Sequence, residues 1–420
     1  MKTNREFEAL LPDPWPGCHF IGEEETQAVM RVLRSRSPSR FMGPDVQGFA
    51  QRLEAWYSAY LGRRYTIAVS SGSTALAVCL SALDIGPGDE VLIPGYAWAA
   101  CYNAIVRAGA IPRLVEIDET LTIDPNDLIQ KISPHSRAVL LVHMNGGCGD
   151  VQHIADLCKG QGLVLIEDVC QANGGRFNGR PLGSFGDMAV FSFQMNKTIT
   201  AGEGGLIACD DETLWRRAWM YHDHGYWHAP CNVPMTSNPS KESGWGLGAR
   251  TSELTAAMAL AQATKLEEIV RAMQGHQRLL YEGLADLLDV QFRRGTATEN
   301  DIGNWLVLIW PDKARCEAIV RKTRQADICT ASGFGNLILT EMGLHLYYNN
   351  LSLVNKVPTH SSGRPWSDPL NNFASDYYYG KGALPRTDRL LERIQLLFVS
   401  PVRTKEAVQT ILDIFCRCVD

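Results

Sequence analysis

The stretch MAVFSFQMNKTITAGEGGLIACD, residues 188–210, contains two apolar runs that are separated by one lysine and a group of glycines. Both runs are short and almost free of polar residues, which is typical of strands that are covered on both faces of a sheet. In the loop between them, Lys197 would ordinarily be a solvated side chain, because lysine is rarely buried. The stretch therefore predicts two central strands of an α/β sheet, and the rest of the chain must decide the role of Lys197.

On the N-terminal side of this stretch, short apolar or β-branched runs alternate with longer helical patterns. Such alternation predicts βαβ units around a mostly parallel sheet. The runs that we expect to be strands are residues 65–71, 89–95, 111–118, 138–145, 163–169, 188–193 and 204–210.

The C-terminal half has a different organisation. Residues 250–288 form the longest helical pattern and are expected to bridge to a second domain. A Pro-, Ser- and Asn-rich loop follows at about 355–376, and an amphipathic helix is expected from Thr404. We therefore predict an N-terminal arm and large domain over residues 1–262, and a smaller α+β domain over residues 263–420.

Composition and charge limit the classes of function. The chain has 420 residues, 45% of them hydrophobic, and a formal net charge of −6. This charge gives no overall attraction to nucleic acid or anionic lipid, so neither is expected as a partner. Without a signal-peptide core or an apolar membrane span, we expect a cytoplasmic protein. The 12 cysteines include no CxxC pair, which favours reduced thiols over disulfides or a zinc site; no metal is expected.

Three predicted elements carry residues that are suited to bind a ligand. The strand at 163–169 ends with Asp168, at the carboxyl edge where open α/β sheets bind ligands. Lys197 follows the next strand, and the small residues Gly72, Ser73 and Thr74 open a helix whose N–H groups suit an anion. Pyridoxal phosphate (PLP) fits all three elements. Its aldehyde bonds to a lysine, its ring nitrogen is kept protonated by an acid, and its phosphate needs such a helix N-terminus.

Four segments extend this interpretation to a known family. VSSGSTAL (69–76), GPGDEVLIPGYAWAACYNAI (86–105), IEDVCQANGG (166–175) and FSFQMNKTITAGEGG (191–205) resemble the DegT/DnrJ/EryC1/StrS sugar aminotransferases of the PLP-dependent fold type I. LPRTDRLLERIQLLFVSP (384–401) resembles the closing segment of that family. The resemblance implies a three-layer αβα fold with a mostly parallel central sheet.

The same resemblance implies roles for individual residues. Lys197 and Asp168 would be catalytic, and both would contact the cofactor. Trp98 would stack on the pyridine ring, Gln171 would lie near the ring hydroxyl, and Ser192 would bind the phosphate. His143 and His224 are further candidates for the pocket, although a single histidine is more often structural.

One segment departs from the family pattern. GWGLGARTSEL (244–254) has Gly248 where the family commonly has an asparagine that reaches the phosphate of the partner subunit, but it keeps Arg250. The resemblance implies a homodimer with both active sites at the interface. We therefore expect Arg250, or a backbone N–H, to replace the missing asparagine. The segment at 345–376 is also longer and more polar than in the family, so substrate recognition is expected to differ.

The expected activity is transfer of an amino group from glutamate or glutamine to a keto sugar, which in this family is often nucleotide-linked, or to a keto cyclitol. Pyridoxamine phosphate (PMP) would arise during the reaction, in secondary-metabolite (antibiotic) or surface-sugar biosynthesis. An alternative is a PLP-dependent dehydratase or aromatising enzyme that resembles 3-amino-5-hydroxybenzoate synthase. A non-enzymatic regulatory protein is a third class. Retention of Ser73, Trp98, Asp168, Gln171 and Lys197 argues against it, and Lys197 argues against sugar dehydratases that carry histidine there.

Overall fold

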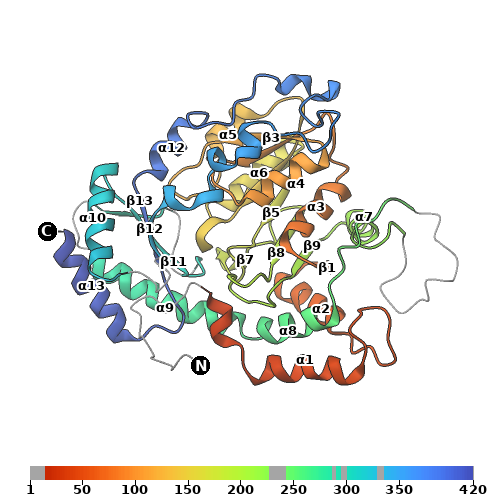
Figure 1. Cartoon of the computed structure of the whole chain (residues 1–420), viewed down its shortest axis with the longest axis horizontal. Helices are drawn as coiled ribbons and strands as arrows, with labels where there is room; N and C mark the ends of the chain where they lie inside the picture. The colour runs from red at the N-terminus through yellow and green to blue at the C-terminus, as the bar shows by residue number, and fades with distance from the viewer. Residues whose placement is uncertain (1–14, 227–242, 286–289, 295–299, 329–334, 420) are drawn as a thin grey trace.

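The computed structural model describes residues 15–226, 243–285, 290–294, 300–328 and 335–419. The first 14 residues of the expected N-terminal arm lie outside these ranges. Figure 1 shows a large sheet flanked by helices and a smaller sheet beside the C-terminal helices. Within the described ranges, no helix combines the length and the apolar character needed to cross a membrane.

The large sheet has seven strands in the order β1-β9-β8-β5-β4-β2-β3. The β2–β3, β2–β4, β4–β5 and β5–β8 pairs are parallel, whereas β9 is antiparallel to both β1 and β8. The prediction of a mostly parallel sheet is therefore confirmed. The strands are β1 (Tyr65–Val69), β2 (Glu90–Pro94), β3 (Ile111–Val115), β4 (Ser136–Val142), β5 (Val164–Asp168), β8 (Met188–Ser192) and β9 (Gly205–Cys209).

Both faces of this sheet are buried, because alternate residues of each strand enter opposite cores. In β4, Leu140 belongs to the core beneath one set of helices and Leu141 to the core beneath the other. The first set is α3 (Gly72–Ala82), α4 (Ala99–Ala108) and α7 (Glu212–His222). The second is α2 (Phe49–Leu61), α5 (Pro125–Lys131), α6 (Val151–Gln161) and α8 (Glu253–Ala263). This is the expected three-layer arrangement.

The C-terminal part contains a four-stranded antiparallel sheet in the order β10-β11-β13-β12. One face contributes Val307 and Leu396 to a core of the large sheet, and the other packs Leu308 and Leu397 against helices. The strands are β10 (Gln291–Phe292), β11 (Trp305–Ile309), β12 (Asn336–Ile338) and β13 (Ile394–Phe398), and the helices are α9 (Leu266–Leu284), α10 (Lys313–Gln325) and α13 (Lys405–Val419). The boundary between residues 262 and 263 stays a prediction.

The helical pattern over residues 250–288 contains two helices in the structure. α8 ends at Ala263 and α9 begins at Leu266. Between them, the Lys265 N–H donates to Gln262 O at 3.0 Å, so the turn tightens by one residue. The Lys265 ammonium is held by Glu25 Oε2 at 2.9 Å and by Phe20 O at 2.8 Å. These contacts are made outside the helix and are invisible in its apolar spacing.

The remaining helices and strands complete the described part of the chain. The segment that we expected to be a loop at about 355–376 contains a 3-10 helix, η6 (Pro369–Ala374). The others are η1 (Pro16–Phe20), α1 (Glu23–Ser35), η2 (Met144–Gly146), β6 (Arg176–Phe177), β7 (Arg180–Pro181), η3 (Leu339–Glu341), η4 (Gly343–His345), η5 (Tyr347–Asn349), α11 (Leu351–Val354) and α12 (Pro385–Leu391).

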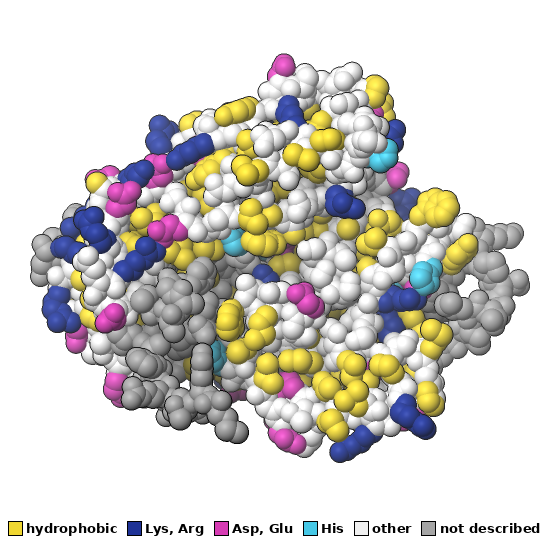
Figure 2. Space-filling model, viewed as in Figure 1, with side chains coloured by type: hydrophobic (Ala, Val, Ile, Leu, Met, Phe, Trp, Pro, Cys, Tyr) yellow, Lys and Arg dark blue, Asp and Glu magenta, His cyan; other side chains and the backbone are white. Residues whose placement is uncertain are grey.

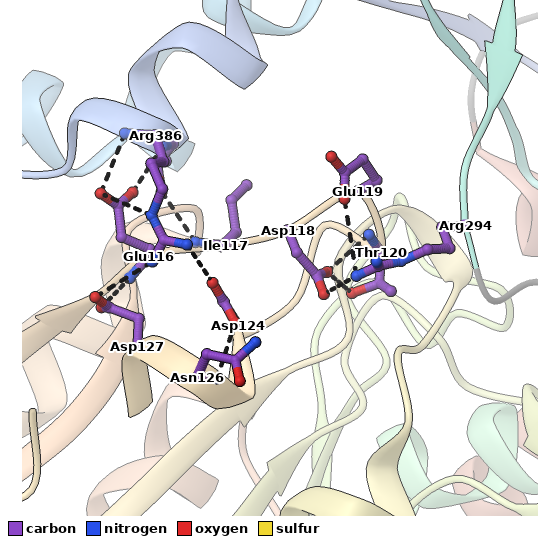
Figure 3. Close-up of polar contacts among 11 residues, drawn as sticks. Glu116, Ile117, Asp118, Glu119, Thr120, Asp124, Asn126, Asp127, Arg294 and Arg386 are labelled. Carbon is purple, nitrogen blue, oxygen red and sulfur yellow. Dashed lines mark hydrogen bonds and ion pairs between the residues drawn. The ribbon is translucent and has the colours of Figure 1, made fainter. Parts of the chain in front are cut away.

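Arginines of the C-terminal part meet acidic residues that follow β3 (Figure 3). Arg386 Nη1 lies 2.6 Å from Asp124 Oδ2, and the backbone N–H of Arg386 donates to Glu116. Arg294 pairs with Asp118. In the face seen in Figure 2, Lys and Arg side chains are interspersed with Asp and Glu, especially near the C-terminal helices at the left. The described residues on this face therefore form no extended basic surface.

Candidate functional site

A cavity of about 590 Å³ lies at the carboxyl ends of β5 and β8, beside the first turn of α3. It brings together most residues that the sequence predicted. These are Gly72, Ser73, Trp98, Asp168, Gln171, Ser192 and Lys197. Parallel strands end at one edge of a sheet, which explains why side chains that are far apart in the sequence converge there.

Asp168 is the last residue of β5 and is only 4% exposed. Its Oδ1 accepts the backbone N–H of Cys170 at 2.9 Å, and its Oδ2 accepts the Cys101 thiol at 3.2 Å. Burial, together with the Asp168 charge, raises the pKa of the Cys101 thiol well above its usual value, so the thiol keeps the proton it donates. Across the described residues, no ion pair involves Asp168. A buried carboxylate without a cation is costly, so this site suits a ligand with a protonated nitrogen.

Lys197 lies in the connection between β8 and β9 and lines the same cavity. Both backbone polar groups of Lys197 are hydrogen-bonded. The N–H donates to Gln194 O at 3.0 Å, and the carbonyl accepts the Gly17 N–H at 3.4 Å. Over the described ranges, no ion pair involves its ammonium group. The Lys197 amine is therefore available to a group inside the cavity.

The first turn of α3 forms the anion-binding side of the cavity. The Ser71 side chain accepts the Thr74 N–H at 3.1 Å, whereas the N–H groups of Gly72 and Ser73 have no acceptor within the described part of the chain. A Cβ at Gly72 would lie 2.9 Å from Ser192 Cβ, so only glycine permits this close approach. The Thr74 hydroxyl oxygen completes the cap of the helix by accepting the Ser71 N–H at 3.0 Å, and Thr74 does not line the cavity.

Gly205 has a related packing role. A Cβ at this position would lie 2.5 Å from the Ser71 carbonyl carbon, so its absence lets β9 pack directly against the start of α3. At least this glycine of the GEGG run is therefore needed for the backbone that shapes the cavity.

Trp98 and Gln171 lie on the other side of the cavity. Trp98 is the N-cap residue of α4 and is 43% exposed, which is unusual for a side chain with so much apolar surface. The Gln171 Oε1 atom accepts the Asn145 N–H at 3.2 Å. Both side chains are thus presented to the cavity by backbone that is already fixed in the fold.

Sequence reasoning missed several residues that line the cavity. They are Trp15, Asn304, Met342 and His345. The His345 ring contacts Trp98, with ring centroids 4.8 Å apart, and its Nε2 lies 3.2 Å from Gln171 Nε2. The unusual polarity of the segment that begins at 345 was the only signal, and it did not point to this histidine.

The two histidines that were candidates do not line the cavity. His143 is fully buried and its Nε2 lies 3.2 Å from Glu167 Oε2. Burial opposes ionisation of Glu167, but hydrogen bonds from His143 and from the backbone of Gly183 and Gly186 hold the pKa of Glu167 below its usual value. His224 is half exposed and lies beside Asp223. Each histidine therefore lies beside a carboxylate of its own chain and outside the cavity.

The Gly248 region also lies away from the cavity of its own chain. The Gly248 N–H donates to Asp223 O at 2.8 Å, and Arg250 Nη1 lies 2.7 Å from Asp223 Oδ1. Trp245, three residues before Gly248, is 92% exposed, and Leu247 is half exposed. This segment therefore presents apolar side chains and a guanidinium at the surface.

A buried arginine fixes the segment that contacts Gln171. Arg293 is 4% exposed and donates to Thr120 O at 2.8 Å, Met144 O at 2.6 Å and Asn145 O at 3.2 Å. Its charge faces Asp301 at 3.7 Å. Arg293 therefore holds the backbone of the segment that supplies the Asn145 N–H to Gln171.

Comparison with known proteins identifies the family of the chain. Residues 19–359 match the DegT/DnrJ/EryC1/StrS aminotransferase family. The chain belongs to that family. The resemblance predicted from the four sequence segments is thus confirmed.

Two curated relatives show the extent of the sequence similarity. GDP-perosamine synthase from Vibrio cholerae is 34% identical over 248 residues, which cover 57% of this chain and 63% of that protein. L-glutamine:2-deoxy-scyllo-inosose aminotransferase from Micromonospora echinospora is 31% identical over 302 residues, 70% of each chain. The match thus spans less than two thirds of the first of these relatives.

Solved structures share the fold over nearly the whole chain. An aminotransferase from Psychrobacter cryohalolentis has a TM-score of 0.76 at 23% identity, covering 96% of this chain and 98% of that one. The structure of 3-amino-5-hydroxybenzoic acid synthase has a TM-score of 0.74 at 21% identity, covering 95% and 97%. The fold-type prediction is confirmed by these similarities, which at such identities describe the fold alone.

Proposed function

We propose that this protein is a PLP-dependent aminotransferase. The observation that carries the proposal is the shared cavity of Asp168, Lys197 and the first turn of α3. As far as the described residues go, it offers a buried carboxylate without a cation, an amine without an ion pair, and unbonded N–H groups at a helix N-terminus. Those are the three complements of a protonated ring nitrogen, an aldehyde and a phosphate.

Each residue has a distinct task in this proposal. Asp168 holds the proton on the ring nitrogen, and Trp98 packs on the ring face. The N–H groups of Gly72 and Ser73, with the hydroxyls of Ser73 and Ser192, bind the phosphate. Thr74 supports them indirectly because its hydroxyl oxygen accepts the Ser71 N–H and so caps α3.

Lys197 is the proton-transfer group. When bound, the cofactor supplies an electron sink for the negative charge left at the carbon that loses its proton. Lys197 lines the same cavity, so its Nζ would remove the proton from the amino donor and return one during amination of the ketone. The hydrogen bonds from the Lys197 backbone to Gln194 and Gly17 hold the residue that carries this amine.

The substrates are inferred from similarity. The Micromonospora relative is named for glutamine and a keto cyclitol, and the Vibrio relative for a GDP-linked sugar. We infer glutamine or glutamate as the donor and a keto sugar, nucleotide-linked or free, or a keto cyclitol as the acceptor. The alternative related to 3-amino-5-hydroxybenzoate synthase is supported by fold similarity alone, whereas the aminotransferase function is also supported by sequence relatives.

We also propose a homodimer in the cytoplasm. Exposed Trp245 and Leu247, next to Arg250, suit a face that is covered by a second subunit. The arginine would then reach the phosphate site of the partner and replace the asparagine that is missing at Gly248. The described cysteines are all free thiols, which suits a reducing compartment.

The test is to locate the cofactor on the chain. Purified protein should be yellow, and borohydride reduction followed by peptide mass mapping should place a PLP adduct on Lys197. Lys197→Ala should still bind PLP or PMP through Asp168 and the α3 turn, but should not turn over. Lys265, whose ammonium is engaged by Glu24 and Glu25, is the matched control and should stay unmodified. An adduct on any other lysine would disprove the assignment.

A further inference from the structure

Three hydrogen bonds in series connect the β4–η2 segment to the segment after η3. The Asn145 N–H lies 3.2 Å from Gln171 Oε1, Gln171 Nε2 lies 3.2 Å from His345 Nε2, and His345 Nδ1 lies 2.8 Å from Met342 O. Each end of the series is a backbone group with one possible role. These two fixed roles determine which atom donates and which accepts in every hydrogen bond of the series.

The directions follow from the chemistry of the end groups. The Met342 carbonyl only accepts, so His345 Nδ1 carries a hydrogen. The Asn145 N–H only donates, so the Gln171 atom that it contacts is the carbonyl oxygen. The remaining bond must then run from Gln171 Nε2 to an unprotonated His345 Nε2. This arrangement holds only while the imidazole is neutral.

The surroundings of His345 keep the ring neutral. Burial lowers its pKa to about 4, against the hydrogen bond to Met342, and the charge of Lys197 in the same cavity acts in the same direction as burial. The other charged residues that line the same cavity are Asp168 and Glu203. At neutral pH the Nε2 atom is thus an acceptor.

The position of His345 is also fixed by backbone contacts. The Ala97 N–H donates to His345 O at 3.0 Å, and the Tyr347 N–H donates to Gly95 O at 3.1 Å. These bonds tie the segment to the residues just before Trp98, whose ring the imidazole contacts. His345 therefore touches both side chains that are expected to contact the cofactor ring.

We propose that His345 is a positioning residue, whose unprotonated Nε2 holds the Gln171 amide so that Gln171 offers an N–H, and not its carbonyl oxygen, to the cofactor's ring hydroxyl. The proposal rests on the proposed function. Gln171 Nε2 carries two hydrogens, and His345 takes one. The second has no acceptor in the described residues and is left for the cavity. An N–H donor stabilises a ring oxygen that has lost its proton.

The experiment is a pH titration of the visible absorbance of the bound cofactor. His345→Phe keeps an aromatic ring against Trp98 but removes the acceptor, so the Gln171 amide is free to rotate. Loss of one hydrogen bond to a charged oxygen should raise the titration midpoint by roughly one pH unit, a tenfold change in proton affinity. His345→Gln, whose carbonyl oxygen can replace Nε2, should restore most of the midpoint.

A second variant separates positioning from a general structural effect. Gln171→Ala should raise the midpoint as much as His345→Phe does, and in the Gln171→Ala background His345→Phe should add no further shift. Gln171→Ala also decides the matter if His345→Phe does not fold. An unmoved midpoint in Gln171→Ala, or equal shifts in His345→Phe and His345→Gln, would overturn the role of His345. If the unmodified protein shows no cofactor band, the proposed function fails instead, and this proposal with it.

Discussion

Replacing Arg293 by methionine should lower the free energy of unfolding more than replacing any exposed arginine does. The free energy of unfolding of this variant should also depend on pH. The side chain lies 3.7 Å from Asp301 and donates to three backbone carbonyls, of Thr120, Met144 and Asn145. Removing one partner of a buried ion pair costs about 3–5 kcal/mol, because the other charge stays buried. We expect a loss of this size in the free energy of unfolding near pH 7, partly offset by the apolar contacts of methionine.

The pH dependence arises from Asp301. Burial raises the pKa of this carboxyl, and Arg293 opposes that rise. Without Arg293 the pKa rises further, so the folded variant binds a proton that the unfolded chain releases near pH 4. The unfolding free energy of Arg293→Met should therefore decrease as pH increases, by up to about 1.4 kcal/mol per unit, until pH exceeds the folded pKa. The unmodified protein should show the same sign with a smaller slope.

The measurement is urea unfolding followed by tryptophan fluorescence, at one protein concentration, between about pH 5 and pH 8. Arg293→Met/Asp301→Asn should lose the added slope and regain part of the stability, because no buried charge remains. Arg294→Met is the matched control. Its side chain is 61% exposed and pairs with Asp118 and Glu119 (Figure 3), so it should cost less than about 1 kcal/mol. Equal losses for the two arginines, or an added slope that persists in the double variant, would refute this reasoning.

Two further predictions concern the proposed active site. Asp168→Asn should reduce turnover by roughly 10²–10⁴, the range associated with positioned proton-transfer groups; steady-state kinetics decides, and near-normal turnover would show that Asp168 is not at the ring nitrogen. Mixing equal amounts of Lys197→Ala and Arg250→Ala subunits should restore up to about a quarter of normal activity, since half the dimers are mixed and each has one intact site. A fully active Arg250→Ala protein, or a monomer with full turnover, would contradict the interface proposal.

Much of the fold followed from local pattern. The strands of the large sheet are continuous apolar runs because both faces are covered, and that pattern is visible without the structure. The convergence of Asp168 and Lys197 also followed from the sequence. Each residue comes at or after the carboxyl end of a predicted strand, and parallel strands place such ends at one edge. The break between α8 and α9 did not follow, because it depends on Lys265 meeting Glu25 of α1.

The sequence by itself determined the layered α/β architecture and the residues of the α3 turn, β5 and the β8–β9 connection, because these depend on interactions between near neighbours in the chain. Only the tertiary structure decided that His345 meets Gln171, 174 positions away, and that Arg293 meets Met144, 149 positions away. Such contacts depend on how the C-terminal part packs on the large sheet. No periodicity encodes them, since a single polar side chain gives the same local pattern whether it faces water or a buried carbonyl.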